Sequence, residues 1–130
     1  MGDGEQISVL DSDLNLITLF SVTDTGQVGG IFYDKETDIL YAACKNDGLR
    51  LLDLSDPETP IIAGSYFYPD NDSIEINGVY VKNQIAYLAC GLGGVLILDV
   101  TNPNDPALLS EVALPGAWGY TYVMDIFISG

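Results

Sequence analysis

The sequence predicts an all-β fold made of antiparallel four-stranded repeats, and two observations lead to this prediction. First, the chain repeats itself: Tyr41 and Tyr87 lie in closely similar segments 46 positions apart. Second, its apolar segments are short, alternate with turn-forming residues and lack the three-to-four spacing of an amphipathic helix. We therefore expect little or no helix in the 130 residues.

The internal repeat extends well beyond the two tyrosines. Residues 40–44 align with residues 86–90, and the same shift places residues 48–60 on residues 94–106, with an aspartate and two prolines at matching positions. A weaker copy at residues 7–13 opens the chain without the prolines, at a shift of 42 positions. Repetition at a period of about 20 to 50 residues indicates stacked supersecondary units.

Each copy contains short predicted strands separated by turn signals. In the central copies we expect strands at residues 28–33, 39–44, 49–54 and 61–68, and at 76–81, 85–90, 95–100 and 107–114, followed by a last strand at 123–128. Asp47 and Gly48 favour the positive φ of a tight hairpin between the second and third strands. Pro57 and Pro60 lack amide donors, so the third strand ends before them.

Two of these segments resemble a known family. Residues 48–57, Gly-Leu-Arg-Leu-Leu-Asp-Leu-Ser-Asp-Pro, and residues 94–103, Gly-Val-Leu-Ile-Leu-Asp-Val-Thr-Asn-Pro, are similar to the LVIVD repeat. The resemblance implies four-stranded β-propeller blades and mostly secreted or surface-exposed prokaryotic proteins without an assigned chemistry. The chain departs from the pattern in its first copy, which lacks the prolines, and in the extended segment 69–75.

Counting strands against this pattern predicts a partial β-propeller of about 2.75 blades. We expect one repeat domain over residues 1–130, with a partial blade at 5–22, blades at 27–68 and 75–114, and the first strand of a further blade at 118–130. Such an arrangement leaves strand edges open at both ends, and propellers normally close their ring to remove such edges. We therefore expect either a part of a larger chain or a short variant that forms homo-oligomers through these edges.

Composition excludes several function classes. The formal net charge of -15, with only four basic residues, disfavours nucleic acid as a partner and favours cations or basic proteins. The chain has no histidine, the commonest general base and metal ligand. No apolar run approaches the roughly 20 residues of a spanning helix, and the first residues lack the basic and apolar regions of a signal peptide.

The acidic segment 69–75 is one candidate site. Asp70, Asp72 and Glu75 provide alternating oxygen ligands of the kind that calcium prefers. The segment has neither the glycine nor the distal glutamate of a full calcium loop, and a solvated acidic loop without a cofactor is the alternative. The same carboxylates are the chain's only evident acid and base pair for a hydrolase, although no partner carboxylate across a cleft is apparent.

Aromatic and cysteine residues form the other candidates. Trp118, Tyr120 and Tyr122 gather before the last predicted strand, where they would form a recognition surface or pack neighbouring blades together. Cys44 and Cys90 occupy equivalent positions, which favours two free buried thiols over a disulfide or a zinc site.

The aspartates at the ends of the third strands also have an expected role. Asp53 and Asp99 each precede a Ser or Thr by two positions, so we expect their carboxylates to accept backbone amides in the following turn.

These features predict a non-catalytic binding or scaffold module of a secreted or surface protein, with a protein partner. A structural subunit that assembles through its strand edges is the alternative, and a hydrolase that uses the segment 70–75 is a further one.

Overall fold

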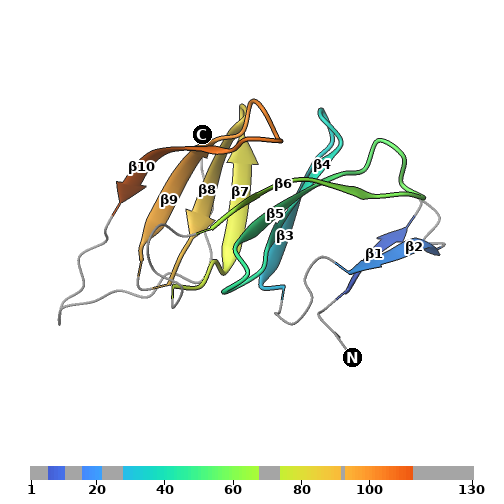
Figure 1. Cartoon of the computed structure of the whole chain (residues 1–130), viewed down its shortest axis with the longest axis horizontal. Helices are drawn as coiled ribbons and strands as arrows, with labels where there is room; N and C mark the ends of the chain where they lie inside the picture. The colour runs from blue at the N-terminus through green and yellow to red at the C-terminus, as the bar shows by residue number, and fades with distance from the viewer. Residues whose placement is uncertain (1–5, 11–15, 22–27, 68–73, 92, 113–130) are drawn as a thin grey trace.

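The computed structural model describes residues 6–10, 16–21, 28–67, 74–91 and 93–112, and these residues form ten strands and no helix (Figure 1). The strands are β1 (Gln6–Leu10), β2 (Leu16–Ser21), β3 (Gly30–Asp34), β4 (Ile39–Ala43), β5 (Leu49–Asp53), β6 (Ile61–Tyr66), β7 (Gly78–Lys82), β8 (Ile85–Ala89), β9 (Val95–Asp99) and β10 (Ala107–Val112). In this part of the chain no helix is long and apolar enough to cross a membrane.

The strands pair in sequence order into three antiparallel units. Unit A is the β1–β2 hairpin, unit B is the sheet β3-β4-β5-β6, and unit C is the sheet β7-β8-β9-β10. In Figure 1 units B and C stand beside each other, with β3 next to β7, and unit A lies on the opposite side of unit B. The predicted all-β fold of four-stranded antiparallel repeats is confirmed. The predicted strand at residues 118–130 lies outside the described residues, so the count of about 2.75 blades stays a prediction.

The first strand of each full unit begins two residues later than the sequence predicted. Ile76 does not pair within its own sheet, because its amide and carbonyl bond the carbonyl and amide of Lys45 at 3.1 and 2.9 Å. Asn77 then donates its amide to the Ala89 carbonyl at 2.7 Å and starts the ladder of unit C. In unit C the strand boundary is therefore determined by a contact between units.

The outer strand of each unit contains a β-bulge at the same place in the repeat. The pairing shifts at Ile17 in β2, at Ala63 in β6 and at Leu109 in β10, which are 46 positions apart. A bulge twists an edge strand and interrupts its row of pairing groups, which protects it from aggregation. The weak first copy thus has the same outer-strand irregularity as the two strong ones.

The core lies between units B and C. Alternate residues of β4 and β5 form one face of unit B. This face packs against the face of unit C that alternate residues of β7, β8 and β9 form. The cluster comprises Ile39, Tyr41, Ala43, Leu49 and Leu51 of unit B, and Ile76, Val79, Val81, Ala86, Leu88, Cys90, Leu96, Leu98 and Val100 of unit C. Full burial of one such large side chain stabilises a fold by roughly 1.5 to 3 kcal/mol.

Candidate binding pocket between two hairpins

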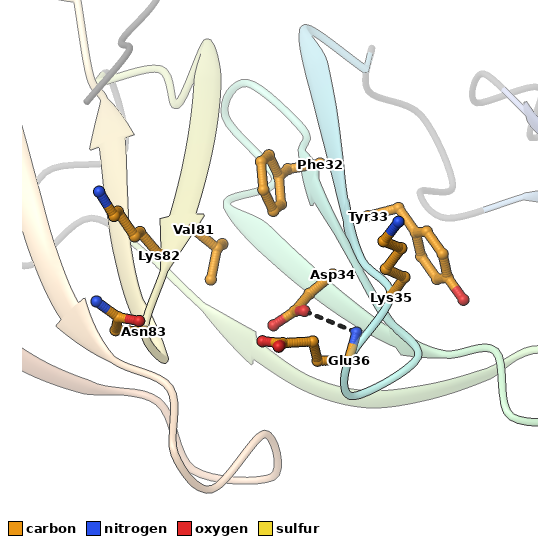
Figure 2. Close-up of a pocket in the computed structure, with 8 residues that line it drawn as sticks. All are labelled: Phe32, Tyr33, Asp34, Lys35, Glu36, Val81, Lys82 and Asn83. Carbon is orange, nitrogen blue, oxygen red and sulfur yellow. Dashed lines mark hydrogen bonds between the residues drawn. The ribbon is translucent and has the colours of Figure 1, made fainter. Parts of the chain in front are cut away.

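A pocket of about 340 Å³ lies where the first hairpins of units B and C meet. Its lining comes from both units: Phe32, Tyr33, Asp34, Lys35 and Glu36 from the β3–β4 hairpin, and Val81, Lys82 and Asn83 from the β7–β8 hairpin. Figure 2 shows the Phe32 ring and the Val81 side chain projecting between β3 and β7, with the Asp34 and Glu36 carboxylates near the β3–β4 turn. The pocket exists only because the two units are packed together.

The β3–β4 turn is held by its own polar groups. Asp34 Oδ1 accepts the Glu36 amide at 3.0 Å, and the Asp34 carbonyl accepts the Thr37 amide at 3.3 Å. The Tyr33 hydroxyl donates to Asp38 Oδ1 at 2.6 Å, and this hydrogen bond raises the pKa of Tyr33. Asp38 adopts a left-handed φ of 60°, which aspartate tolerates better than most residues. The Glu36 side chain is exposed at the edge of the pocket.

The β7–β8 turn has only two residues, Asn83 and Gln84. Their φ angles are 52° and 62°, and a type I′ hairpin turn requires positive φ at both positions. Asparagine suits such a position, whereas glutamine is uncommon there. Because this turn is two residues shorter than the β3–β4 turn, the first strands of units B and C are offset by 48 positions while the second strands are offset by 46.

An aromatic contact joins β3 and β7, the first strands of the two units, beside the pocket. The rings of Phe32 and Tyr80 meet edge to face, with centroids 5.1 Å apart and an interplanar angle of 62°. Such pairs add about 0.5 to 1.5 kcal/mol beyond the area they bury. This contact packs Phe32 against the first strand of unit C.

The basic residues of the chain divide into two groups. Lys45 Nζ donates to Asn77 Oδ1 at 2.8 Å across the two units, and the Arg50 guanidinium donates to the Asp47 carbonyl and lies 5.1 Å from the centre of the Phe67 ring. Lys35 and Lys82 both line the pocket. The lining of the pocket therefore contains both signs of charge together with the apolar side chains of Phe32 and Val81.

The residues predicted as sites are mostly outside the described part of the chain. Asp70 and Asp72 lie outside it, while Glu75 is described and half-buried, so the calcium prediction stays untested. Trp118, Tyr120 and Tyr122 also lie outside it, and their role stays a prediction. Among the described residues no group of three or more carboxylate or cysteine side chains is placed to hold a metal ion.

Both cysteines match their prediction as free buried thiols. Cys44 and Cys90 are free, and neither is exposed to solvent. Burial raises the pKa of Cys44 to about 11 and that of Cys90 to about 12. A nucleophilic cysteine needs a lowered thiol pKa, so these two thiols are unreactive at neutral pH.

The predicted turn role of the two aspartates is also confirmed. Asp53 Oδ1 accepts the Ser55 amide at 2.8 Å, and Asp99 Oδ1 accepts the Thr101 amide at 2.9 Å. Each carboxylate also accepts the hydroxyl of the same Ser or Thr, and these bonds lower the pKa of both aspartates.

Sequence reasoning missed the pocket itself. Asp34, Lys35 and Glu36 fall between the predicted strands at residues 28–33 and 39–44, and nothing in the pattern placed them opposite Lys82 and Asn83. The sequence contains one signal that could have indicated it, the two extra residues between the first and second strands of unit B. An insertion within one copy of a repeat indicates a loop, often on the binding face.

The architecture identifies the chain as an all-β repeat protein with four-stranded, propeller-like units. The family model described as LVIVD repeat matches residues 38–67 and 74–114, which together are more than half of the chain. The protein belongs to the LVIVD repeat family. No curated protein and no solved structure matches it.

Proposed function

We propose that the protein is a non-catalytic binding or scaffold module of a secreted or surface-exposed propeller protein, and that the pocket between the two first hairpins contributes to its binding surface. The observation that supports this proposal is the shared lining of the pocket by units B and C. A site at the ends of strands, between adjacent units of a rigid scaffold, is a common position for binding residues. The remaining binding surface would include the predicted aromatic group Trp118, Tyr120 and Tyr122.

The charge of the protein favours a basic protein segment as the partner. A formal charge of -15 attracts cations from a distance and accelerates their association. At the pocket, the Asp34 and Glu36 carboxylates would accept hydrogen bonds from a lysine or arginine head group, and the Phe32 ring would contact its aliphatic stem. Lys82 and Asn83, on the opposite side, would bind a carboxylate or backbone carbonyl of the same segment.

A peptide titration tests this proposal. A lysine- and arginine-rich peptide should bind at low salt, its glutamate-substituted counterpart should not, and affinity should fall as salt rises. Glu36→Gln should weaken binding about 2-fold to 5-fold, in line with the loss of one exposed charged contact. Glu58→Gln is the matched control, because it removes the same charge from an exposed loop away from the pocket lining. Equal affinities for the two variants would place binding elsewhere.

A structural subunit that self-assembles is the second candidate, and one observation favours it. All six residues of β10 are exposed, including Leu108, Leu109 and Val112. Apolar exposure of this kind on an outer strand is typical of a surface that another chain covers. Light scattering coupled to size exclusion distinguishes the two proposals, because a monomer over a wide concentration range contradicts assembly.

A further inference from the structure

Units B and C approach each other closely at two glycines of unit B. Just before β3, a Cβ added to Gly29 would lie 2.6 Å from the Asn77 carbonyl oxygen. In β6, a Cβ added to Gly64 would lie 2.1 Å from the Pro103 carbonyl oxygen. Both obstructing atoms belong to the backbone of unit C, so a side chain at either position would push the two units apart.

A hydrogen bond between the two units accompanies the contact at Gly64. Asn104 Nδ2 donates to the carbonyl of Ala63, the bulged residue of β6 that precedes Gly64, at 2.8 Å. The loop that follows β9 in unit C thereby fits against the bulge of unit B. Gly64 allows the loop backbone to come close enough for this bond.

Conformational freedom does not explain these glycines. The positive φ angles of glycine in the described residues occur at Gly48, Gly91 and Gly94, and neither Gly29 nor Gly64 is among them. A glycine within a strand that has room for a side chain weakens the strand. Close approach of the neighbouring unit is therefore the reason for glycine at both positions.

Unit C has side chains at the two equivalent positions. Asn77 corresponds to Gly29, because its amide bonds the Ala89 carbonyl as the Gly29 amide bonds the Ala43 carbonyl. Ser110 corresponds to Gly64, because it pairs with Ile97 as Gly64 pairs with Leu51. The first unit differs as well, since Thr18 occupies this register position opposite Val9. Only unit B has glycine at this place in its outer strand.

We propose that Gly29 and Gly64 make units B and C a close-packed pair, and that Ser110 prevents a proline loop from docking on β10 in the way that the Pro103 loop docks on β6. The Cβ of Ser110 would overlap a loop carbonyl placed as Pro103 is placed on Gly64. A neighbour on β10 would have to lie about 1.3 Å farther out to reach ordinary van der Waals contact. Any partner of β10 therefore binds in a different arrangement from that of unit C on unit B.

A series of glycine-to-alanine substitutions tests the first part. An added Cβ meets backbone at 2.1 Å at Gly64, at 2.6 Å at Gly29 and at 3.3 Å at Gly30. The melting temperature should fall by about 5 °C or more for Gly64→Ala, by less for Gly29→Ala, and should stay within about 2 °C for Gly30→Ala. If Gly64→Ala does not fold, the order of the other two variants is the test. Unchanged or raised melting temperatures for Gly64→Ala and Gly29→Ala would overturn the proposal.

A large side chain on β10 tests the second part. Ser110 is exposed, so Ser110→Tyr should leave the melting temperature within about 2 °C of wild type. A loss as large as that of Gly64→Ala would show that a segment of the chain packs on β10 as closely as the Pro103 loop packs on β6, which contradicts the proposal. The Gly64→Ala and Ser110→Tyr variants are made in the 130-residue chain.

Discussion

Raising the pH from about 8 to about 10 should destabilise the protein through its two buried thiols. In the folded state the pKa of Cys44 rises from 9.0 to about 11 and that of Cys90 from 9.0 to about 12, chiefly because burial disfavours the thiolate. The unfolded chain loses these protons near its ordinary thiol pKa, while the folded chain keeps them. The unfolded state then binds fewer protons than the folded one, so stability falls as the pH rises, from near 9 until the folded thiols ionise.

The size of this effect follows from the proton balance. Each thiol that ionises only in the unfolded state lowers the free energy of unfolding by about 1.4 kcal/mol per pH unit once the pH exceeds its unfolded pKa. Integrated from pH 8 to pH 10, the loss is about 1.3 kcal/mol for each thiol and about 2.6 kcal/mol for both. This figure rests on a thiol pKa of 9.0 in the unfolded chain and on folded pKa values that lie above the window. Tyr41, whose pKa burial raises to about 12, adds to the loss only near the top of the window.

Urea unfolding across this pH range, under reducing conditions, measures the loss. The control is the double variant Cys44→Ala and Cys90→Ala, which is less stable at pH 8 because it leaves small cavities in the core. Its stability should nevertheless decline much less between pH 8 and pH 10. An equal decline in wild type and double variant would show that the thiols are not the cause and that they ionise as readily in the fold as outside it.

Two further predictions concern turns. Gln84→Gly should raise the free energy of unfolding by up to about 1 kcal/mol, because glycine adopts the observed φ of 62° without strain; Gln84→Ala, which keeps the strain, should bring no gain in urea unfolding. Replacing Asp53 and Asp99 by alanine should lower the melting temperature at neutral pH, because Ser55 and Thr101 lose their acceptors. Since the pKa of both carboxyls is lowered in the fold, this difference from wild type should be largest well above pH 3.8 and should shrink as the pH falls through the lowered values.

The strand pattern was predictable because each strand is short and bounded by residues with one strong local preference. Gly48 has a φ of 82°, as the Asp-Gly signal predicted, and Gly94 has a φ of 77° in the equivalent turn. The two turns have matching hydrogen bonds, from Cys44 to the Gly48 carbonyl and from Cys90 to the Gly94 carbonyl, both at 2.8 Å. Local chemistry alone determines these features, so they repeat wherever the residues do.

Contacts between units were not predictable in the same way. Lys45 reaches Asn77, and Asn104 reaches Ala63, across 32 and 41 positions of sequence. Each contact depends on how closely two sheets approach, and the residue types that form it differ from one copy to the next: Lys45 corresponds to Gly91, and Asn104 to Glu58. Alignment of the copies shows where strands recur because it relies on residues that the copies share. The contacts between units depend on residues that differ between the copies, so the alignment does not indicate them.

The candidate pocket arises at one of these differences. Strands β4 and β8 keep the 46-residue period, and so do the three outer-strand bulges, because they pair with neighbours in a fixed register. The turn before β4 has no such constraint and is two residues longer than the turn before β8. This longer turn contains Lys35 and Glu36, which extend the wall of the pocket opposite Asn83. A repeat protein that keeps its period in the paired strands can vary its hairpin turns without disturbing the core, and in this protein the longer turn adds the charged side chains of Lys35 and Glu36 to the pocket.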